Sequence, residues 1–102
     1  MTATYTNLYP REAEFNGNYY VNTHMALAAE LLGPSVLVSW ELYRLPDDAP
    51  FSYEIAVTWA SAEARQRALE SDAGQTLARD VVNFSRMPPI VMLRRPLACG
   101  GP

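Results

Sequence analysis

His24 is the only histidine in the chain, and its type and position make it the first candidate for chemistry. An imidazole titrates near neutrality and can take up or deliver a proton. Residues at i, i+4, i+7 and i+11 share one face of a helix, so His24 is expected to point inward together with an apolar stripe. That stripe consists of Tyr20, His24, Leu27 and Leu31. We therefore consider His24 as an acid and base, with Tyr20 as its hydrogen-bond partner.

An apolar gap between this helix and a sheet is the natural place for a ligand. The chain has six tyrosines and two tryptophans, which suit the walls of a pocket for a flat aromatic molecule. A tyrosine hydroxyl there can stabilise a developing enolate or phenolate. These features predict proton chemistry that needs no cofactor, namely cyclisation, dehydration, isomerisation or decarboxylation. The alternative is structural: His24 is a hydrogen-bonded core residue, Asp80 and Asn83 cap or turn the chain, and the aromatic residues form the core.

The helix that carries His24 is expected to run from about Tyr19 to Leu32. Either Asn16 or Asn18 can cap its first turn, and Gly33 with Pro34 ends it in a left-handed conformation followed by a helix breaker. A strand over Ala3–Tyr9, stopped by Pro10, precedes the helix.

The remaining elements follow from hydrophobic periodicity and breakers. Ser35–Leu45 and Phe51–Ala60 alternate with a period of two and predict a hairpin joined by residues 46–50, with Val36, Val38, Trp40 and Leu42 sharing one face. Ser61 is expected to cap a helix that runs through Leu69, and Asp72 to cap a further helix over Ala73–Asp80. After a loop from Asn83 to Pro89, the last strand is Ile90–Arg95, ended by Pro96. The order β-α-β-β-α-β predicts an α+β, ferredoxin-like domain: a four-stranded antiparallel sheet with the helices on one face.

A dimer is expected because both faces of the predicted sheet carry apolar groups. Leu37 and Tyr43 alternate with Val36, Val38 and Trp40 in the hairpin. The same face of a second copy is the simplest cover and would give a two-fold dimer in which two sheets form a barrel. Glu41 and Glu54 are expected on the wet face or in a salt bridge of the dimer. The alternative is a monomer with a few exposed apolar groups.

Composition excludes several other classes of function. With eleven acidic and eight basic residues, the net charge of −3 disfavours nucleic acid as a partner. One histidine and one cysteine are a poor set of zinc ligands, so no metal is expected. The sequence has no phosphate loop or dinucleotide fingerprint, so no other cofactor is expected either. No segment is apolar enough to suggest a membrane span or a secretory signal, which predicts a cytoplasmic protein. The chain of 102 residues is expected to form one domain over residues 1–96, followed by a flexible tail over residues 97–102 that contains Cys99.

Several motifs resemble the EthD family of the dimeric α+β barrel superfamily. The similarity covers nearly the whole chain, and its core is a Phe, a Tyr-Tyr pair and a His four residues after the second Tyr. A later Ser, Gly, Leu, Asp and Asn-Phe run adds to it. Ala26 stands where the family often has Pro, and residues after Pro96 match no pattern of the family. The motif residues are Leu8-Tyr9-Pro10, Phe15, Asn18-Tyr19-Tyr20, His24-Met25, Leu32-Gly33, Ser71, Gly74, Leu77, Asp80 and Asn83-Phe84.

The resemblance implies a pocket between helices and sheet and a homodimer, but no particular reaction. Relatives in the superfamily include polyketide cyclases, cofactor-free monooxygenases, isomerases and lyases. The first hypothesis is an enzyme acting on an aromatic or polyketide-like molecule through His24 and Tyr20. The second is a non-catalytic accessory protein that binds a hydrophobic metabolite for an oxidative degradation pathway, and the third is a purely structural dimer. The residues expected to line the site besides His24 and Tyr20 are Phe15, Tyr19, Trp40, Trp59, Asp80, Asn83 and Phe84.

Overall fold

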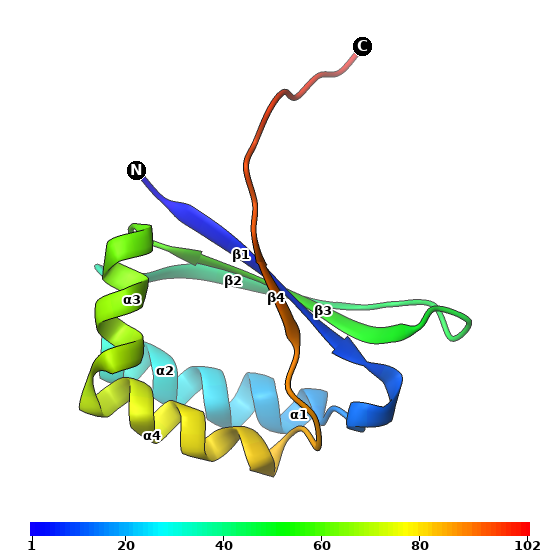
Figure 1. Cartoon of the computed structure of the whole chain (residues 1–102), viewed down its shortest axis with the longest axis horizontal. Helices are drawn as coiled ribbons and strands as arrows, with labels where there is room; N and C mark the ends of the chain where they lie inside the picture. Colours follow the sequence, from blue (N-terminus) through cyan, green and yellow to red (C-terminus); the bar gives the residue numbers. More distant parts are fainter.

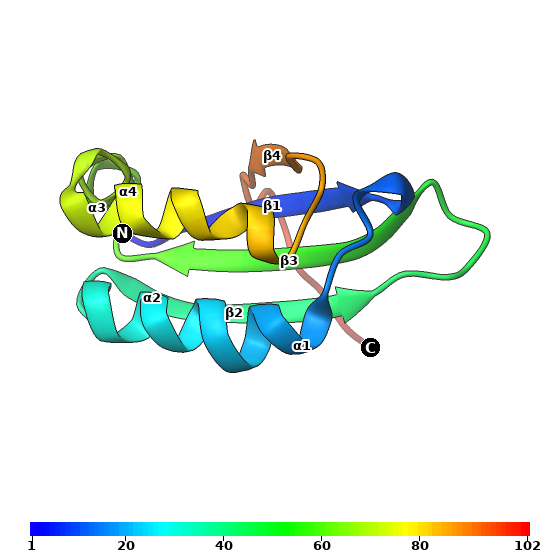
Figure 2. The ribbon, with the colours of Figure 1, turned by 90° about the horizontal axis from the view of Figure 1, so that it is seen from below.

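A computed structural model describes all 102 residues and confirms the predicted α+β fold. Four antiparallel strands lie in the order β2-β3-β1-β4, and the helices cover one face of this sheet (Figure 1). Seen from below, α2 and α4 run side by side in front of the strands (Figure 2). The strands are β1 (Ala3–Pro10), β2 (Leu37–Arg44), β3 (Phe51–Trp59) and β4 (Ile90–Leu93); the helical segments are η1 (Arg11–Ala13), α1 (Gly17–Tyr19), η2 (Tyr20–His24), α2 (Met25–Leu32), α3 (Ala62–Glu70), α4 (Asp72–Asp80) and η3 (Val81–Asn83).

The register of the sheet separates its two faces. Ile55 of β3 lies opposite Leu42 on one side and Asn7 on the other, and Asn7 in turn pairs with Val91. This row faces the helices, because Ile55 is completely buried in the core. Side chains alternate along a strand, so the neighbouring row points to the opposite, helix-free face. That second row consists of Tyr43, Glu54, Leu8 and Ile90.

A bulge near the start of β2 corrects the predicted alternation. Leu37 pairs with Trp59 and Ser39 with Thr58, so Val38 is an extra residue on this strand. Leu37 is therefore buried, whereas Val38 is 46% exposed. Val36 precedes the strand, in a turn. The expected stripe begins correctly only at Trp40, because sequence alternation does not register an inserted residue.

The helical segment that carries His24 begins as predicted but contains a wider turn. Asn16 is the cap, and its side chain accepts a hydrogen bond from the Tyr19 amide at 3.0 Å. Residues Tyr20–His24 then form a π-helical turn, closed by a bond from the Met25 amide to the Tyr20 carbonyl. Gly33 ends α2 as expected, and its φ of 76° is positive, but its ψ of 166° lies outside the left-handed helical region.

The π turn accompanies a shift in the inward-facing stripe. Tyr20 and His24 are buried as expected, but Leu31 is 41% exposed and Leu27 is only partly buried. The core positions that follow His24 are instead Met25 and Ala28, with Leu32 packed against them. A π turn holds an additional residue, which advances the buried side of the next helix relative to a regular 3.6-residue repeat.

The second helical region is a corner of two short helices. Ser61 caps α3 as predicted, by accepting a hydrogen bond from the Ala64 amide at 2.9 Å. Ser71, rather than Asp72, caps α4: its hydroxyl accepts from the Gly74 amide at 3.1 Å and donates to the Ala68 carbonyl at 2.6 Å. One serine thus joins the end of α3 to the start of α4, and Asp72 occupies the first turn.

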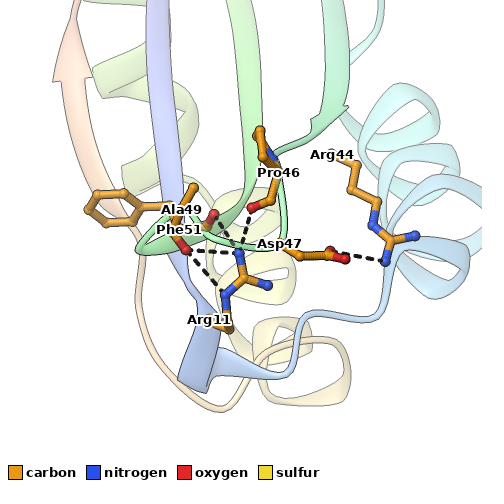
Figure 3. A network of polar contacts seen from close by, with 6 residues as sticks. All are labelled: Arg11, Arg44, Pro46, Asp47, Ala49 and Phe51. Atoms are coloured by element: carbon orange, nitrogen blue, oxygen red, sulfur yellow. Dashed lines mark hydrogen bonds and ion pairs between the residues drawn. The ribbon is translucent and has the colours of Figure 1, made fainter.

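Arg11 holds the loop between β2 and β3 against the end of β1 (Figure 3). Its guanidinium donates to the carbonyl oxygens of Ala49 at 2.8 Å and Pro46 at 2.9 Å, and more weakly to that of Phe51. The Pro46 carbonyl also accepts a hydrogen bond from the Ala49 amide at 3.0 Å, so Arg11 reinforces a turn that the loop forms itself.

The C-terminal part differs slightly from the prediction. Asn83, expected in a loop, ends the 3-10 turn η3, and β4 ends at Leu93 instead of Arg95. The last residues run away from the sheet (Figure 1), with Leu97 94% exposed and Cys99 exposed. None of the helices is long and apolar enough to cross a membrane.

Candidate functional site

A cavity of about 280 Å³ lies between the sheet and the helices. Fourteen of its seventeen lining residues are hydrophobic, and His24 is the only histidine, lysine, arginine, aspartate or glutamate among them. Pockets for small molecules are typically apolar with a few placed polar groups, and this cavity has that character. The lining includes Asn7, Tyr9, Val57 and Trp59 from the sheet, and Tyr20, His24, Met25, Leu77 and Phe84 from the helical side.

His24 is anchored by Asp80. Its Nδ1 lies 2.9 Å from Oδ2 of Asp80, and both side chains are largely buried, with 11% and 13% of their surface exposed. An ionised carboxylate can only accept a hydrogen bond, so Nδ1 of His24 donates. Nε2 is then the nitrogen without a hydrogen when the imidazole is neutral, and it is available to act as a base.

Asp80 is itself held by two further donors. The Tyr19 hydroxyl donates to Oδ1 at 2.6 Å, and the Asn83 amide donates to the same oxygen at 2.9 Å. Burial alone would raise the pKa of Asp80, but hydrogen bonds from Tyr19, Asn83 and His24 outweigh it and lower that pKa below its ordinary value. The same bond to Asp80 raises the pKa of the Tyr19 phenol. Asp80 is thus an ionised, fixed acceptor behind His24.

Two aromatic rings of the cavity lining pack against the imidazole. The Phe84 ring centroid lies 4.6 Å from that of His24 and the Tyr20 centroid 5.5 Å, the latter nearly parallel at 28°. Tyr20 therefore stacks on His24, and the hydrogen-bond partner of His24 is Asp80 instead of Tyr20. Burial raises the pKa of Tyr20 well above its ordinary value, so its phenol stays protonated.

Local structure explains how these residues meet. The π turn brings Tyr20 and His24 to the inner side of the first helical segment, while Asp80 ends α4. The 3-10 turn that follows places the Asn83 side chain within hydrogen-bond distance of the Asp80 carboxylate, three residues before it in the sequence. A backbone hydrogen bond of 2.8 Å from the Asn16 amide to the Phe84 carbonyl ties the two regions together.

The predicted site residues fall into three groups. Tyr20, His24, Trp59 and Phe84 line the cavity. Tyr19, Asp80 and Asn83 form the hydrogen-bonded group behind His24. Phe15 and Trp40 lie outside the lining: the Phe15 ring packs 5.5 Å from Phe84 in the core, and the Trp40 ring meets the edge of Tyr20 at 6.0 Å.

Two polar lining residues were not among the predicted site residues. Tyr9 is 5% exposed, and burial raises its pKa to about 12. Asn7 lies in the middle of β1, on the face that carries Tyr9. The signal for Asn7 was present in the sequence, because asparagine is disfavoured inside a strand and needs a reason to be there.

The site offers proton chemistry. No group of three or more histidine, cysteine, aspartate or glutamate side chains is arranged to hold a metal ion. The imidazole has one nitrogen fixed by a carboxylate, and two neutral phenols lie in the same lining. This combination can accept a proton at Nε2 and donate hydrogen bonds from the phenols.

Comparison with known proteins supports the fold. The sequence matches no protein-family profile and no curated protein. Its structure is similar to that of an EthD-like protein from Ralstonia eutropha, with a TM-score of 0.76 and 23% identity over 91% of this chain and 89% of that one. An ethyl tert-butyl ether D (EthD) family protein from Bacillus halodurans has a TM-score of 0.69 at 18% identity, over 95% of this chain and 100% of that one.

A third similar structure is that of a single-residue variant of SnoaB, a cofactor-independent oxygenase from Streptomyces nogalater. It has a TM-score of 0.67 and 18% identity over 96% of this chain and 95% of that one. These identities establish the shared fold alone. The resemblance to EthD proteins that the motif residues predict is thus confirmed at the level of the fold.

Proposed function

We propose that the cavity binds an aromatic or polyketide-like small molecule and that His24 moves a proton on it without a cofactor. The observation that carries this proposal is the contact between His24 and Asp80 in the wall of an apolar cavity. A buried histidine with only a structural role needs neither an ionised partner nor a place in a cavity lining. Trp59 and Phe84 supply flat apolar walls for the ligand.

The proposed step is the removal of a proton from carbon next to a ligand carbonyl. The proton moves to Nε2 of His24, the C–H electron pair forms a C=C bond, and the carbonyl π pair moves to oxygen to give an enolate. Asp80 stabilises the resulting imidazolium, and the Tyr20 hydroxyl donates to the enolate oxygen. If the ligand is an unsaturated ketone, the dienolate can take the proton back from Nε2 at its γ-carbon, which isomerises it. If the ligand carries a β-hydroxyl, this group takes the proton from Nε2 and leaves as water, which dehydrates the ligand.

Deuterium exchange into 2-tetralone tests this step. This neutral bicyclic ketone has acidic C–H groups beside its carbonyl, and enolate formation in D₂O replaces those protons with deuterium. We expect wild-type protein to accelerate the exchange above the buffer rate and His24→Gln to abolish the acceleration while the ketone still binds. Thr23→Ala, an exposed change in the same turn, is the matched control and should leave exchange unchanged.

Other outcomes of this experiment contradict the proposal in distinct ways. Binding of 2-tetralone and of 2-naphthol without accelerated exchange would mean that the chain is a binding or accessory protein. Exchange that survives in His24→Gln would assign the chemistry to another group. Absence of binding by both compounds, followed through the isolated ring signals of His24 in NMR spectra, would reject the cavity as an aromatic-ligand site.

We also propose that the chain forms a two-fold homodimer through the helix-free face of the sheet. Ile90 and Met92 are about half exposed there, at 49% and 47%. Several polar side chains of the same face are already paired: Thr4 with Thr58 at 2.8 Å, and Arg94 with Thr6 at 2.8 Å. A face whose polar groups have partners can be covered without leaving them unsatisfied.

Sedimentation equilibrium tests the dimer. We expect a mass twice that of the 11.4 kDa chain and a shift toward the monomer in Met92→Glu, which places a charge in the proposed interface. Val82→Glu is the control, because Val82 is 80% exposed and lies in the 3-10 turn after α4. A monomeric wild-type protein, or equal dissociation of both variants, would argue against this interface.

A further inference from the structure

We propose that the carboxamide of Asn7 binds the oxygen of the ligand and thereby selects neutral keto or hydroxy compounds. The inference rests on the proposed function, since it concerns the same cavity. Asn7 belongs to the sheet and His24 to the helical side, so the two side chains reach the cavity from different layers of the fold. A ligand held between them would be fixed by its oxygen at one point and by its acidic proton at another.

Asn7 is the polar exception in an apolar row across the sheet. From β2 to β4, the residues of this helix-facing row are Leu42, Ile55, Asn7 and Val91. Val or Ile would suit this central strand better, because asparagine has a low preference for strands. An amide at this position packs less well than an apolar side chain would, and such a departure from the local pattern is typical of a residue with a functional role.

The Asn7 carboxamide has no hydrogen-bond partner within the chain. Its oxygen and nitrogen make none of the side-chain bonds found nearby, such as those of Thr6 with Arg94 on the other face of the strand. No buried polar side-chain atom is both sealed from solvent and unpaired, so the carboxamide is accessible. Because Asn7 lines the cavity, that accessibility is to the site where a ligand would sit.

The cavity lining also specifies the charge of the ligand. Its ionisable groups are His24 and two phenols, and burial raises the pKa of both Tyr9 and Tyr20. No arginine side chain is present there to pair with a carboxylate or phosphate. An anionic ligand would lose its hydration without gaining a cationic partner, so a neutral ligand is favoured.

An amide suits a ligand oxygen that changes charge during proton transfer. The Nδ2 hydrogens of Asn7 can donate to a neutral carbonyl oxygen and donate more strongly once that oxygen carries the enolate charge. The proton leaves carbon for Nε2 of His24, and the electron pair ends on the oxygen, which accepts hydrogen bonds from both the Asn7 amide and the Tyr20 hydroxyl, so no oxidant is required.

The volume of the cavity limits the size of the ligand. A cavity of about 150 Å³ is known to accommodate benzene. The 280 Å³ cavity here is roughly twice as large and therefore fits two fused rings. The ligand class is thus a neutral bicyclic ketone or phenol, or a larger molecule that places such a part in the cavity.

Binding of a matched set of bicyclic probes to Asn7 variants tests the inference. The probes are 2-tetralone, tetralin, which has the same skeleton without oxygen, and 2-naphthoate, which adds a carboxylate. We expect wild-type protein to bind 2-tetralone more tightly than either of the others. Asn7→Val should weaken 2-tetralone binding by about tenfold, the effect of one lost hydrogen bond, and leave tetralin binding unchanged.

The controls keep the possible outcomes separate. Thr4→Val makes a similar change on the helix-free face of the same strand and should not alter binding. Asn7→Ala provides a second variant if valine disturbs the packing, which a melting curve would reveal. Equal binding of 2-tetralone by wild type, Asn7→Val and Asn7→Ala would overturn the role of Asn7 while leaving the ligand site intact. Failure of wild-type protein to bind any of the three probes would overturn the proposed function and this inference together.

Discussion

The Nδ1 atom of His24 and the Oδ2 atom of Asp80 lie 2.9 Å apart although 56 residues separate them in the sequence. This contact joins the π turn η2 to the end of α4 at the wall of the cavity. It fixes the orientation of the imidazole and determines which ring nitrogen is free. The same geometry can support a catalytic base or hold a ligand-binding ring in place, and the difference between these roles is measurable.

Asp80→Asn should change the tautomer of His24. An asparagine in the same orientation offers an amide as well as an oxygen, so it no longer requires a hydrogen on Nδ1. We expect nitrogen-15 spectra of the single imidazole to show hydrogen on Nδ1 in the neutral wild-type ring and a changed distribution in the variant. Accelerated exchange of 2-tetralone should fall by about 100-fold or more, by analogy with the loss of the carboxylate in other histidine dyads. An unchanged tautomer and an unchanged rate would show that Asp80 has no orienting role.

Tyr19→Phe should have a smaller effect through Asp80. The variant loses the 2.6 Å hydrogen bond to Oδ1 of Asp80 but keeps the ring and the bond to His24. We expect the exchange rate to fall by about two- to tenfold, with the affinity for 2-tetralone unchanged, because Tyr19 does not line the cavity.

Tyr43→Phe is the matched control for this variant. Its hydroxyl also donates to a carboxylate, that of Glu41 at 2.5 Å, but on the exposed helix-free face. The control should leave both rate and affinity unchanged. A change in affinity with Tyr19→Phe would instead indicate direct contact with the ligand.

The sequence was sufficient to predict the fold, because alternation and breakers define four strands and two helical regions. It also predicted that His24 points inward and that Asp80 and Asn83 lie near the end of the second helical region. It could not predict that Asp80 reaches His24, because that contact depends on how two distant elements pack. The π turn and the bulge at Val38 were missed for a related reason: each inserts one residue into a repeat without a distinctive residue type.

Acid should destabilise the protein partly through Asp80. Its folded-state pKa is lowered, so the carboxylate contributes stability above the unfolded-state pKa of about 3.9, and this contribution is lost as pH falls through the folded-state value. Urea unfolding at pH 7, 5 and 3 should show a smaller loss of stability for Asp80→Asn than for wild type between pH 5 and 3. Asp48→Asn, at an exposed loop position, should follow wild type. Identical pH dependence in all three proteins would exclude a contribution from Asp80.

Alkali should destabilise the protein through its buried phenols. Burial raises the pKa of Tyr9 to about 12 in the folded state, against about 10 when unfolded. The contribution of this protonated phenol is therefore complete below about pH 10 and is lost as pH rises toward 12. Tyr9→Phe should be nearly as stable as wild type at pH 7 and lose less stability at pH 11. Ultraviolet titration should show one late-titrating phenol fewer in the variant, with the late phenolate of Tyr20 retained, and an unchanged late absorbance change would contradict the assignment.

Gly74→Ala should destabilise the corner between α3 and α4 and disturb the cavity. A Cβ at this position would overlap the carbonyl oxygen of Ala68 and lie 2.7 Å from that of Leu69, and both are backbone atoms that cannot move without shifting the corner. We expect a loss of about 1–3 kcal/mol in unfolding free energy, since overpacking typically has this cost. Because Gly74 lines the cavity, weaker binding of 2-tetralone should accompany the lower melting temperature. Gly17→Ala is the control: its Cβ would have Tyr53 atoms at an ordinary 3.8 Å, and alanine favours the first turn of a helix. If both variants melt together with wild type, the close approach at Gly74 is not what holds the two helices at this corner.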